Sequence, residues 1–449
     1  MSSESPDTPD ETSYPDTERQ PGTSGPRGWQ SGLRKGFIAL SYRNYRLFWL
    51  GQLVSVTGTW MQSLAQSWLV YEILGATPFQ LGLVNVLQFL PVLILGIPAG
   101  ILADRFPKRN IMIATQLGMM VMAITMTVIV FADVVELWHV YVIAGIFGVA
   151  RAVDMPTRQA FVSEVVSKDA LMNAIALNSA LFNTGRIVGP AVAGIMLTIV
   201  GPGPLFAVDA ASYLAVLTGL LMIRVRPITN PSTDSPLLRL REGLRYVRRD
   251  PTIFRTIVMV GMIGIFGMNF NVWVPVLASD YFSAGSSAYG TLFSAMGVGS
   301  LLGALSLAFI GRGPNRARML VAVTLMGAAE ISLALIAGST DALLLGALVL
   351  AVVGFTNTNA MSTANTTVQS TAEDHIRGRV MAVYMTVFAG SVPIGALFAG
   401  WMTGHFGAPV SVATGGTMVV AAALVQVWFA RQSQHATRAA TSVTAKADS

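Results

Sequence analysis

Charged side chains inside long apolar stretches are the residues of this chain most able to do chemistry. A charge at membrane depth is unfavourable by about 3 kcal/mol on insertion scales, so a charge kept there is a candidate for function. Six residues have this placement: Arg151, Asp154, Arg158, Arg186, Asp209 and Glu330. A carboxylate among them could bind and release a proton.

Three of these charges lie toward one end of the fourth apolar stretch. Arg151 and Asp154 are three residues apart, so we expect them to pair on one helical face. Such a pair is either a structural salt bridge near the interface or a part of gating or proton coupling. Glu330 lies deeper in its stretch and could carry a proton, whereas Asp209 lies near the start of its stretch, where we expect water to reach it.

A polar stripe runs along the first apolar stretch. Its residues are separated by 3, 4, 3 and 4 positions, which places them on one helical face: Gln52, Ser55, Thr59, Gln62 and Gln66. In lipid such a face would be unfavourable, so we expect it to line a water-filled or substrate cavity, with hydrogen bonding between helices as the alternative. The same lining is expected to include Asn85, Gln88, Asn269, Asn271 and Trp273.

The loop between the second and third apolar stretches carries a gate motif, which consists of Gly100, Asp104, Arg105, Lys108 and Arg109. Its carboxylate can face a helix N-terminus or an arginine elsewhere in the chain, in a contact made in one conformation and broken in another. The alternative is a loop whose charges only fix topology. The equivalent position later in the chain carries Arg312 in place of Asp104, so we expect an asymmetric gate.

Small residues recur in the fifth apolar stretch as Gly185, Gly189, Pro190 and Gly194. Glycines let membrane helices approach closely, and a proline bends a helix. The pattern therefore predicts tight packing of this stretch against its neighbours.

Membrane-spanning helices must position these residues. The chain is 53% hydrophobic and 12% charged, whereas soluble domains carry about 25% charged residues. Windows of about 20 apolar residues, enough to cross a hydrocarbon core of about 30 Å, recur along the chain. They lie near 47–72, 81–103, 111–131, 138–160, 172–199, 204–224, 253–279, 289–311, 317–337, 341–362, 380–403 and 408–430. The sequence predicts an all-α membrane protein of about twelve transmembrane helices.

Composition also excludes several classes of function. The net charge is +6, but the basic residues lie in alternate loops between apolar stretches, so nucleic acid is not expected as a partner. The absence of cysteine excludes disulfides and thiolate metal sites. The four histidines lack a second ligand at metal spacing, and no phosphate-binding loop occurs. We therefore expect neither an enzyme nor a metal or cofactor site.

Lysine and arginine distribution predicts the orientation. Loops rich in these residues are retained in the cytoplasm, which places both termini there. From their polar composition we expect residues 1–36 to form a disordered tail and residues 431–449 to form a second polar tail. Residues 225–252 form a linker in which 237–249 reads as a basic amphipathic helix on the membrane surface.

The linker divides the chain into halves, 37–224 and 253–430, with six spans each. Gly148 to Asp169 aligns without gaps to Gly354 to His375, and a similar offset brings Lys108 onto Arg316. Two pseudo-symmetric six-helix halves imply a binding site at their interface, near the middle of the membrane.

With these motifs in view, the chain from about Tyr42 to Phe429 resembles the major facilitator superfamily. The opening Tyr42-Arg-Asn-Tyr-Arg-Leu-Phe-Trp-Leu-Gly-Gln52 and the linker's Arg241-Glu-Gly-Leu-Arg-Tyr246 are similar to the branch with the bacterial enterobactin exporter and related drug and proton antiporters. The resemblance implies the major facilitator fold and an alternating-access exporter of amphipathic small molecules, driven by inward proton flow across the bacterial inner membrane. We expect a monomer in the lipid bilayer. A proton-coupled importer of a small nutrient and a non-transporting membrane scaffold or sensor are the alternatives.

Overall fold

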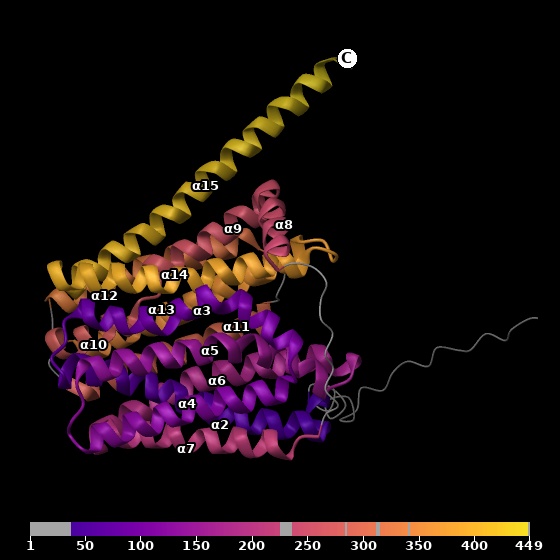
Figure 1. Cartoon of the computed structure of the whole chain (residues 1–449). Coiled ribbons are helices and arrows are strands. Elements are labelled where there is room, and N and C mark those ends of the chain that lie inside the picture. The colour runs from indigo at the N-terminus through magenta and orange to yellow at the C-terminus, as the bar shows by residue number, and fades with distance from the viewer. Residues whose placement is uncertain (1–36, 225–235, 283–284, 311–314, 340–341, 448–449) are drawn as a thin grey trace, which may run out of the picture.

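The chain folds as a bundle of long helices (Figure 1). A computed structural model describes residues 37–224, 236–282, 285–310, 315–339 and 342–447. The helices before the linker are η1 Ile38–Ser41, α2 Arg43–Trp68, η2 Leu69–Ile73, α3 Pro78–Arg105, α4 Lys108–Phe131, α5 Leu137–Val165, α6 Lys168–Val200 and α7 Gly203–Met222. Those that follow are α8 Pro236–Arg249, α9 Pro251–Met262, η3 Ile263–Gly267, α10 Phe270–Val276, η4 Leu277–Tyr281, α11 Gly285–Ile310, α12 Arg316–Ser339, α13 Leu343–Thr371, α14 Arg377–Phe406 and α15 Ala408–Ala447.

The helices have the length and apolarity that a membrane protein needs. Eleven candidate spans within the described residues are long and apolar enough to cross a bilayer. Helix α2 has 26 residues and packs against α6 and α7, so we count it as the twelfth span. Its polar stripe lowers its mean hydropathy below that of the others. The prediction of an all-α membrane protein is confirmed.

Local sequence signals explain where several helices begin and end. Thr77 caps α3: its hydroxyl accepts a hydrogen bond from the Gln80 backbone N–H, and the Gln80 side chain accepts one from the Thr77 N–H. Gly201 ends α6 with φ of 73° and Gly407 ends α14 with φ of 83°. Glycine adopts this left-handed backbone without steric cost, which permits turns short enough to return the chain directly into the bundle.

The two ends of the bundle differ in charge. Loops such as 74–77, 132–136 and 201–202 meet at one end and contain no lysine or arginine, so we call it the non-basic end. The loops rich in these residues meet at the other, which we call the basic end. Residues 1–36 and 225–235, which include a predicted tail and part of the predicted linker, lie outside the described residues.

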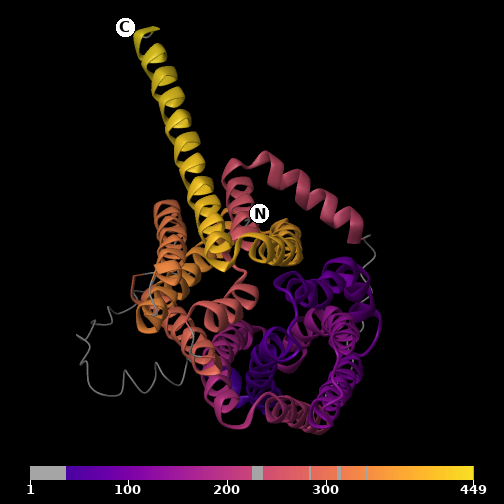
Figure 2. The ribbon, with the colours of Figure 1, turned by 90° about the vertical axis from the view of Figure 1, so that its left-hand side faces the viewer.

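Helix α8 lies across the basic end, roughly perpendicular to the bundle (Figures 1 and 2). Gly243 makes its close approach to α14 possible, because a Cβ there would lie 2.5 Å from the Arg379 carbonyl oxygen. An ion pair between Glu242 and Arg379 lies beside this contact.

The last helix, α15, continues past its apolar part, Ala408–Phe429, and projects from the bundle (Figure 1).

The seventh span is interrupted. The α-helix α9 changes into the π-helical turn η3, stops at Met268 and Asn269, and resumes as α10 and η4. Wide π turns and helix breaks at membrane depth are frequent at functional sites. The break lies beside Glu330 of α12.

Candidate functional site

The halves hold together at the non-basic end. Within the described ranges four hydrogen bonds join them, and all involve residues in the non-basic half of their spans. They are Tyr71 Oη to Asp280 Oδ2 at 2.7 Å, Ser279 Oγ to Glu72 Oε2 at 2.6 Å, Tyr289 Oη to the Leu64 carbonyl at 3.2 Å and Asn271 Nδ2 to Asn85 Oδ1 at 3.4 Å. In this conformation the non-basic end is closed.

Glycines bring the two halves into backbone contact at the same end. Gly194 of α6 packs directly on Gly290 of α11, and a Cβ on either would collide with the backbone of the other. Gly82 of α3 similarly faces the Ala396 carbonyl of α14, 2.5 Å from where its Cβ would be. Two helix pairs therefore close this end without side chains between them.

Replacing Gly194 is expected to open the non-basic end. A Gly194→Leu side chain has no space against Gly290, and overpacking of this kind costs about 1–3 kcal/mol. We expect Val70, which is fully buried here, to become reactive as Val70→Cys, with labelling by a membrane-impermeant maleimide rising roughly 5- to 150-fold.

The cysteine-free chain is the natural background for this experiment. Gly118→Leu is the matched control, because nothing lies within 4 Å of a Cβ at Gly118. Equal labelling of Val70→Cys in the Gly194→Leu and Gly118→Leu backgrounds would show that the glycine contact does not hold this end closed.

The fifth-span pattern also packs within the first half. Gly185 lies against Val56 and Gly189 against Trp60, with a built Cβ 2.8 Å from Val56 Cγ1 and 2.6 Å from Trp60 Cβ. Pro190 is buried beside them. The motif therefore joins α6 to α2 through Gly185 and Gly189, and to the other half through Gly194.

The polar stripe of α2 is almost wholly buried, with only Thr59 half-buried. Gln62 Nε2 donates to Gln66 Oε1 at 2.7 Å, and Gln88 Nε2 of α3 donates to the same oxygen at 3.1 Å. Gln52 Nε2 and Gln66 Nε2 are buried, with no partner among the described residues. Part of the stripe thus makes hydrogen bonds to a neighbouring helix, while two buried amide donors could still bind a substrate or water. That the stripe lines a cavity stays a prediction.

The other predicted lining residues divide into two groups. Asn85 and Asn271 meet across the halves beside the Gln66 and Gln88 pair, which gives an uncharged amide layer at the interface. Trp273 instead directs its indole N–H to Ser411 Oγ of α15, at 2.9 Å. Asn269 donates to the carbonyl of Ile265 in its own span. The structure therefore brings Asn85, Gln88 and Asn271 together, apart from Trp273 and Asn269.

The charges of α5 pair differently from our expectation. Asp154 forms its ion pair with Arg158, not with Arg151, and it also accepts hydrogen bonds from Thr115 and Gln116 of α4, each at 3.0 Å. The guanidinium of Arg151 lies 5.1 Å from the centroid of the Phe89 ring. Positions four apart lie as close on a helix as positions three apart, and the α4 partners decide between them.

Asp209 is not wet. It is fully buried in α7, where Thr59 Oγ1 donates to its Oδ1 at 3.5 Å and its Oδ2 has no partner among the described residues. The hydroxyl of Tyr213, one turn away, is also buried without a partner in the described part of the chain. The expectation of hydration was wrong because α2 covers this face of α7. Arg186 of α6 is half-buried.

Glu330 is the most isolated carboxyl group described. Its exposed fraction is 0%, and neither of its carboxyl oxygens has a hydrogen-bond partner among the described residues. A Cβ on Gly267, the last residue of η3, would lie 3.5 Å from Glu330 Oε1, and a Cβ on Gly416 of α15 would lie 3.0 Å from Glu330 Cβ. The carboxyl group therefore sits where α12 and α15 pack on the interrupted seventh span.

The gate motif lies at the basic end with its groups apart. Lys108 pairs with Glu164 of α5 at 2.7 Å, and Arg109 donates to the Leu220 and Leu221 carbonyls at the end of α7, at 2.6 and 3.1 Å. Arg105 is exposed, and nothing lies within 4 Å of a Cβ on Gly100. Asp104 is half-buried and makes no hydrogen bond or ion pair within the described ranges. A cationic side chain at the end of α7 also complements the helix dipole.

The comparisons with known proteins agree with this architecture. The model of a family described as transmembrane secretion effector matches residues 35–447. The chain belongs to this family, whose fold is that of the major facilitator transporters. Solved structures with the same fold include a bacterial homologue of the lysosomal transporter Spinster, inward-facing and unoccupied, with TM-score 0.62, 15% identity and coverage of 86% of this chain and 95% of that one. A D-xylose-proton symporter gives TM-score 0.64 at 14% identity, covering 86% of this chain and 96% of its own.

Similar proteins include efflux pumps. The multidrug efflux pump Tap of Mycolicibacterium fortuitum is 27% identical over 78% of this chain and 86% of its own length. Macrolide efflux protein A of Streptococcus pyogenes is 21% identical over 86% of this chain and 96% of its own length. The staphyloferrin A transporter of Staphylococcus aureus is 22% identical over 78% of this chain and 87% of its own length. The protein is therefore a multi-pass membrane transporter and not an enzyme, as predicted.

Proposed function

We propose that this protein is a proton-coupled exporter of amphipathic small molecules that works by alternating access. The observation that carries the proposal is the one-sided closure of the bundle. Four hydrogen bonds and the close backbone contacts of two helix pairs join the halves at the non-basic end, whereas no hydrogen bond or ion pair in the described part of the chain joins them at the basic end. The retention of lysine- and arginine-rich loops favours a cytoplasmic position for the basic end, and with that orientation we infer an inward-facing arrangement.

The amide layer supports amphipathic substrates. Asn85 and Asn271 join the halves, and Gln88, one turn from Asn85 on α3, binds Gln66. None of these four side chains carries a charge. Such groups can exchange hydrogen bonds with a polar part of a substrate while apolar side chains around them contact the rest. The similarity to a multidrug efflux pump, a macrolide efflux protein and a staphyloferrin A transporter favours drug-like or siderophore-like molecules and favours export.

Asp104 acts in this proposal as the latch of the outward-facing state. It makes no hydrogen bond or ion pair in the inward-facing arrangement described here, which is the behaviour expected of a contact made only in the other conformation. Lys108 and Arg109 stay bound to α5 and α7 and so hold the loop that presents it.

Glu330 is our preferred group for the coupling proton. Asp154 already has a cation and two hydrogen-bond donors, so its charge is compensated within the protein. An ionised carboxylate buried without partners is strongly unfavourable, so a proton is the simplest counter-charge for Glu330. Its place against η3 couples the protonation state to the packing of the interrupted span.

Efflux from cells tests the proposal and the latch together. Cells without their main pumps, loaded with a fluorescent amphipathic cation, are expected to lose it fast with the native protein and slowly after addition of a protonophore. Asp104→Asn keeps the size of the side chain but removes its charge, and a lost latch worth about 1.4 kcal/mol slows efflux roughly tenfold. Asp133→Asn, in a loop at the opposite end, is the control.

An efflux rate that does not change after addition of the protonophore would contradict proton coupling. Uptake of the cation, in place of its loss, would instead indicate an importer. No movement of any molecule in a panel of amphipathic compounds would favour a membrane scaffold.

A further inference from the structure

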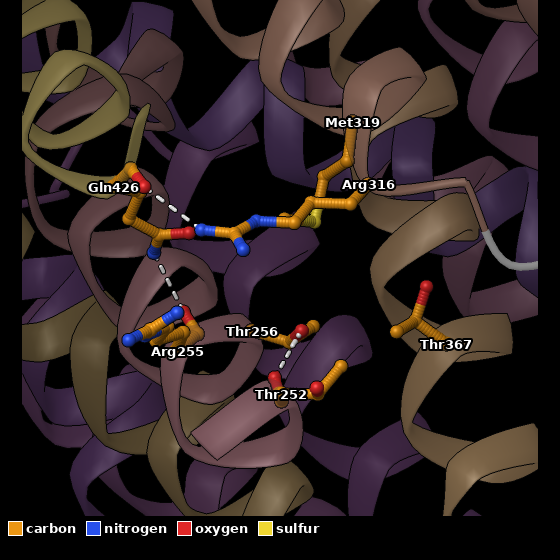
Figure 3. Close-up of a pocket in the computed structure, with 7 residues that line it drawn as sticks. All are labelled: Thr252, Arg255, Thr256, Arg316, Met319, Thr367 and Gln426. Carbon is orange, nitrogen blue, oxygen red and sulfur yellow. Dashed lines mark hydrogen bonds between the residues drawn. The ribbon is translucent and has the colours of Figure 1, made fainter. Parts of the chain in front are cut away.

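A small cavity lies inside the second half at the basic end (Figure 3). Four helices surround it: α9 supplies Thr252, Arg255 and Thr256, α12 supplies Arg316, α13 supplies Thr367 and α15 supplies Gln426. Its volume is about 20 Å³. Thr252 lies in the first turn of α9 and Arg316 is the first residue of α12, so the cavity opens near the level of the lipid headgroups.

Two arginines, Arg255 and Arg316, line this cavity, and no carboxylate of the described residues is among its lining. The guanidinium of Arg255 lies 6.0 Å from the centroid of the Phe429 ring. Arg255 and Arg316 lie within electrostatic reach of each other, and neither has an ion pair with a carboxylate of the described residues. Arg316 Nη2 donates to the Gln426 carbonyl at 2.8 Å (Figure 3). The carboxylate of nearby Asp250 is occupied by the backbone N–H groups of Thr252 and Ile253.

Comparison of the two pseudo-symmetric halves shows that the second half lacks a carboxylate beside this cavity. In the first half Lys108 opens the third span and forms an ion pair of 2.7 Å with Glu164 of the fourth. The internal alignment places Arg316 at the position of Lys108 and Ser370 at the position of Glu164. The second half therefore keeps the cation, adds Arg255 and lacks the carboxylate.

We propose that this cavity binds an anion of phosphate type, either the headgroup of an anionic lipid or phosphate from solution. A guanidinium presents paired N–H donors that match phosphate oxygens. A cavity of about 20 Å³ holds roughly one water-sized group, so one oxygen enters while the rest of the phosphate stays at the mouth. The bound anion takes the place that Glu164 fills in the first half.

Thermal unfolding of the full-length purified protein tests this site without any transport assay. The midpoint is measured in inorganic phosphate against chloride at equal ionic strength, and separately in mixed micelles of phosphatidylglycerol against phosphatidylcholine. A ligand that binds the folded state at well above its Kd raises the midpoint, here by about 2 °C or more. A rise with inorganic phosphate identifies a soluble anion, and a rise with phosphatidylglycerol alone identifies the lipid headgroup.

Variants assign the rise to this cavity. Arg316→Gln should abolish it, whereas Arg43→Gln should keep it, because Arg43 also donates to a carbonyl at a helix end but lies outside the cavity. Ser370→Glu supplies the missing carboxylate and should remove the dependence on the anion while the protein stays folded. No rise with either anion source, or an equal rise in native protein and Ser370→Glu, would overturn the proposal.

Discussion

Glu330→Gln is expected to abolish uphill, proton-driven export while downhill movement of the same substrate continues. Glutamine has the size of glutamic acid but cannot release a proton, so the protein would be held as if permanently protonated. Coupling free energies between sites are typically about 1–3 kcal/mol, so the accumulation ratio should fall roughly 10- to 100-fold. The loss should appear as an export rate that no longer depends on the imposed pH gradient.

The control for this variant is Glu136→Gln. Glu136 lies at the non-basic end before α5, where its carboxylate is exposed and accepts a hydrogen bond from Trp138 Nε1 at 2.9 Å. Removal of that charge should leave the pH dependence unchanged. If Glu330→Gln exports against a gradient with the native dependence on pH, Glu330 does not carry the coupling proton.

Arg158→Met is expected to give the largest loss of stability. The side chains of Asp154 and Arg158 are only 2% and 15% exposed, so loss of the arginine leaves a buried carboxylate with two neutral donors. Removal of one partner of a buried ion pair typically costs about 3–5 kcal/mol. The measurement is the thermal midpoint of the purified protein in detergent, compared with its yield in membranes.

The double variant Asp154→Asn with Arg158→Met separates charge from packing. Because it removes both charges, it should recover most of the stability that the single variant loses. Arg151→Met serves as a second reference, since Arg151 forms no ion pair with a carboxylate of the described residues and its guanidinium lies over the Phe89 ring. Equal losses in the Arg158 single and double variants would mean that the cost comes from packing and not from an unpaired Asp154.

The sequence predicted the membrane spans because their signal is local. An apolar window needs no knowledge of its neighbours, and even α2, with its polar stripe, lies where that signal placed it. The break in the seventh span was not predicted. Glycines at 264 and 267 are common in membrane helices, and nothing local distinguishes a π-helical turn from a continuous helix.

Pairing within the site was harder to predict because it depends on other helices. The spacing of Asp154 allowed either arginine, and only Thr115 and Gln116 of α4 show which side of α5 faces inward. Thr115 and Gln116 carried no periodic signal of their own. Gly194 suggested close packing, but its partner Gly290 lies in the other half, and a single glycine position does not specify a partner.

Simultaneous measurement of substrate and proton movement tests the central claim most directly. The purified protein is reconstituted in vesicles with a pH-sensitive dye in the lumen, and an amphipathic cation is supplied on the side of the basic end with no initial pH gradient. A proton-coupled exporter predicts substrate movement toward the non-basic side together with protons moving the opposite way, and loss of the proton signal in Glu330→Gln. Substrate movement with no proton signal in the native protein would contradict the account.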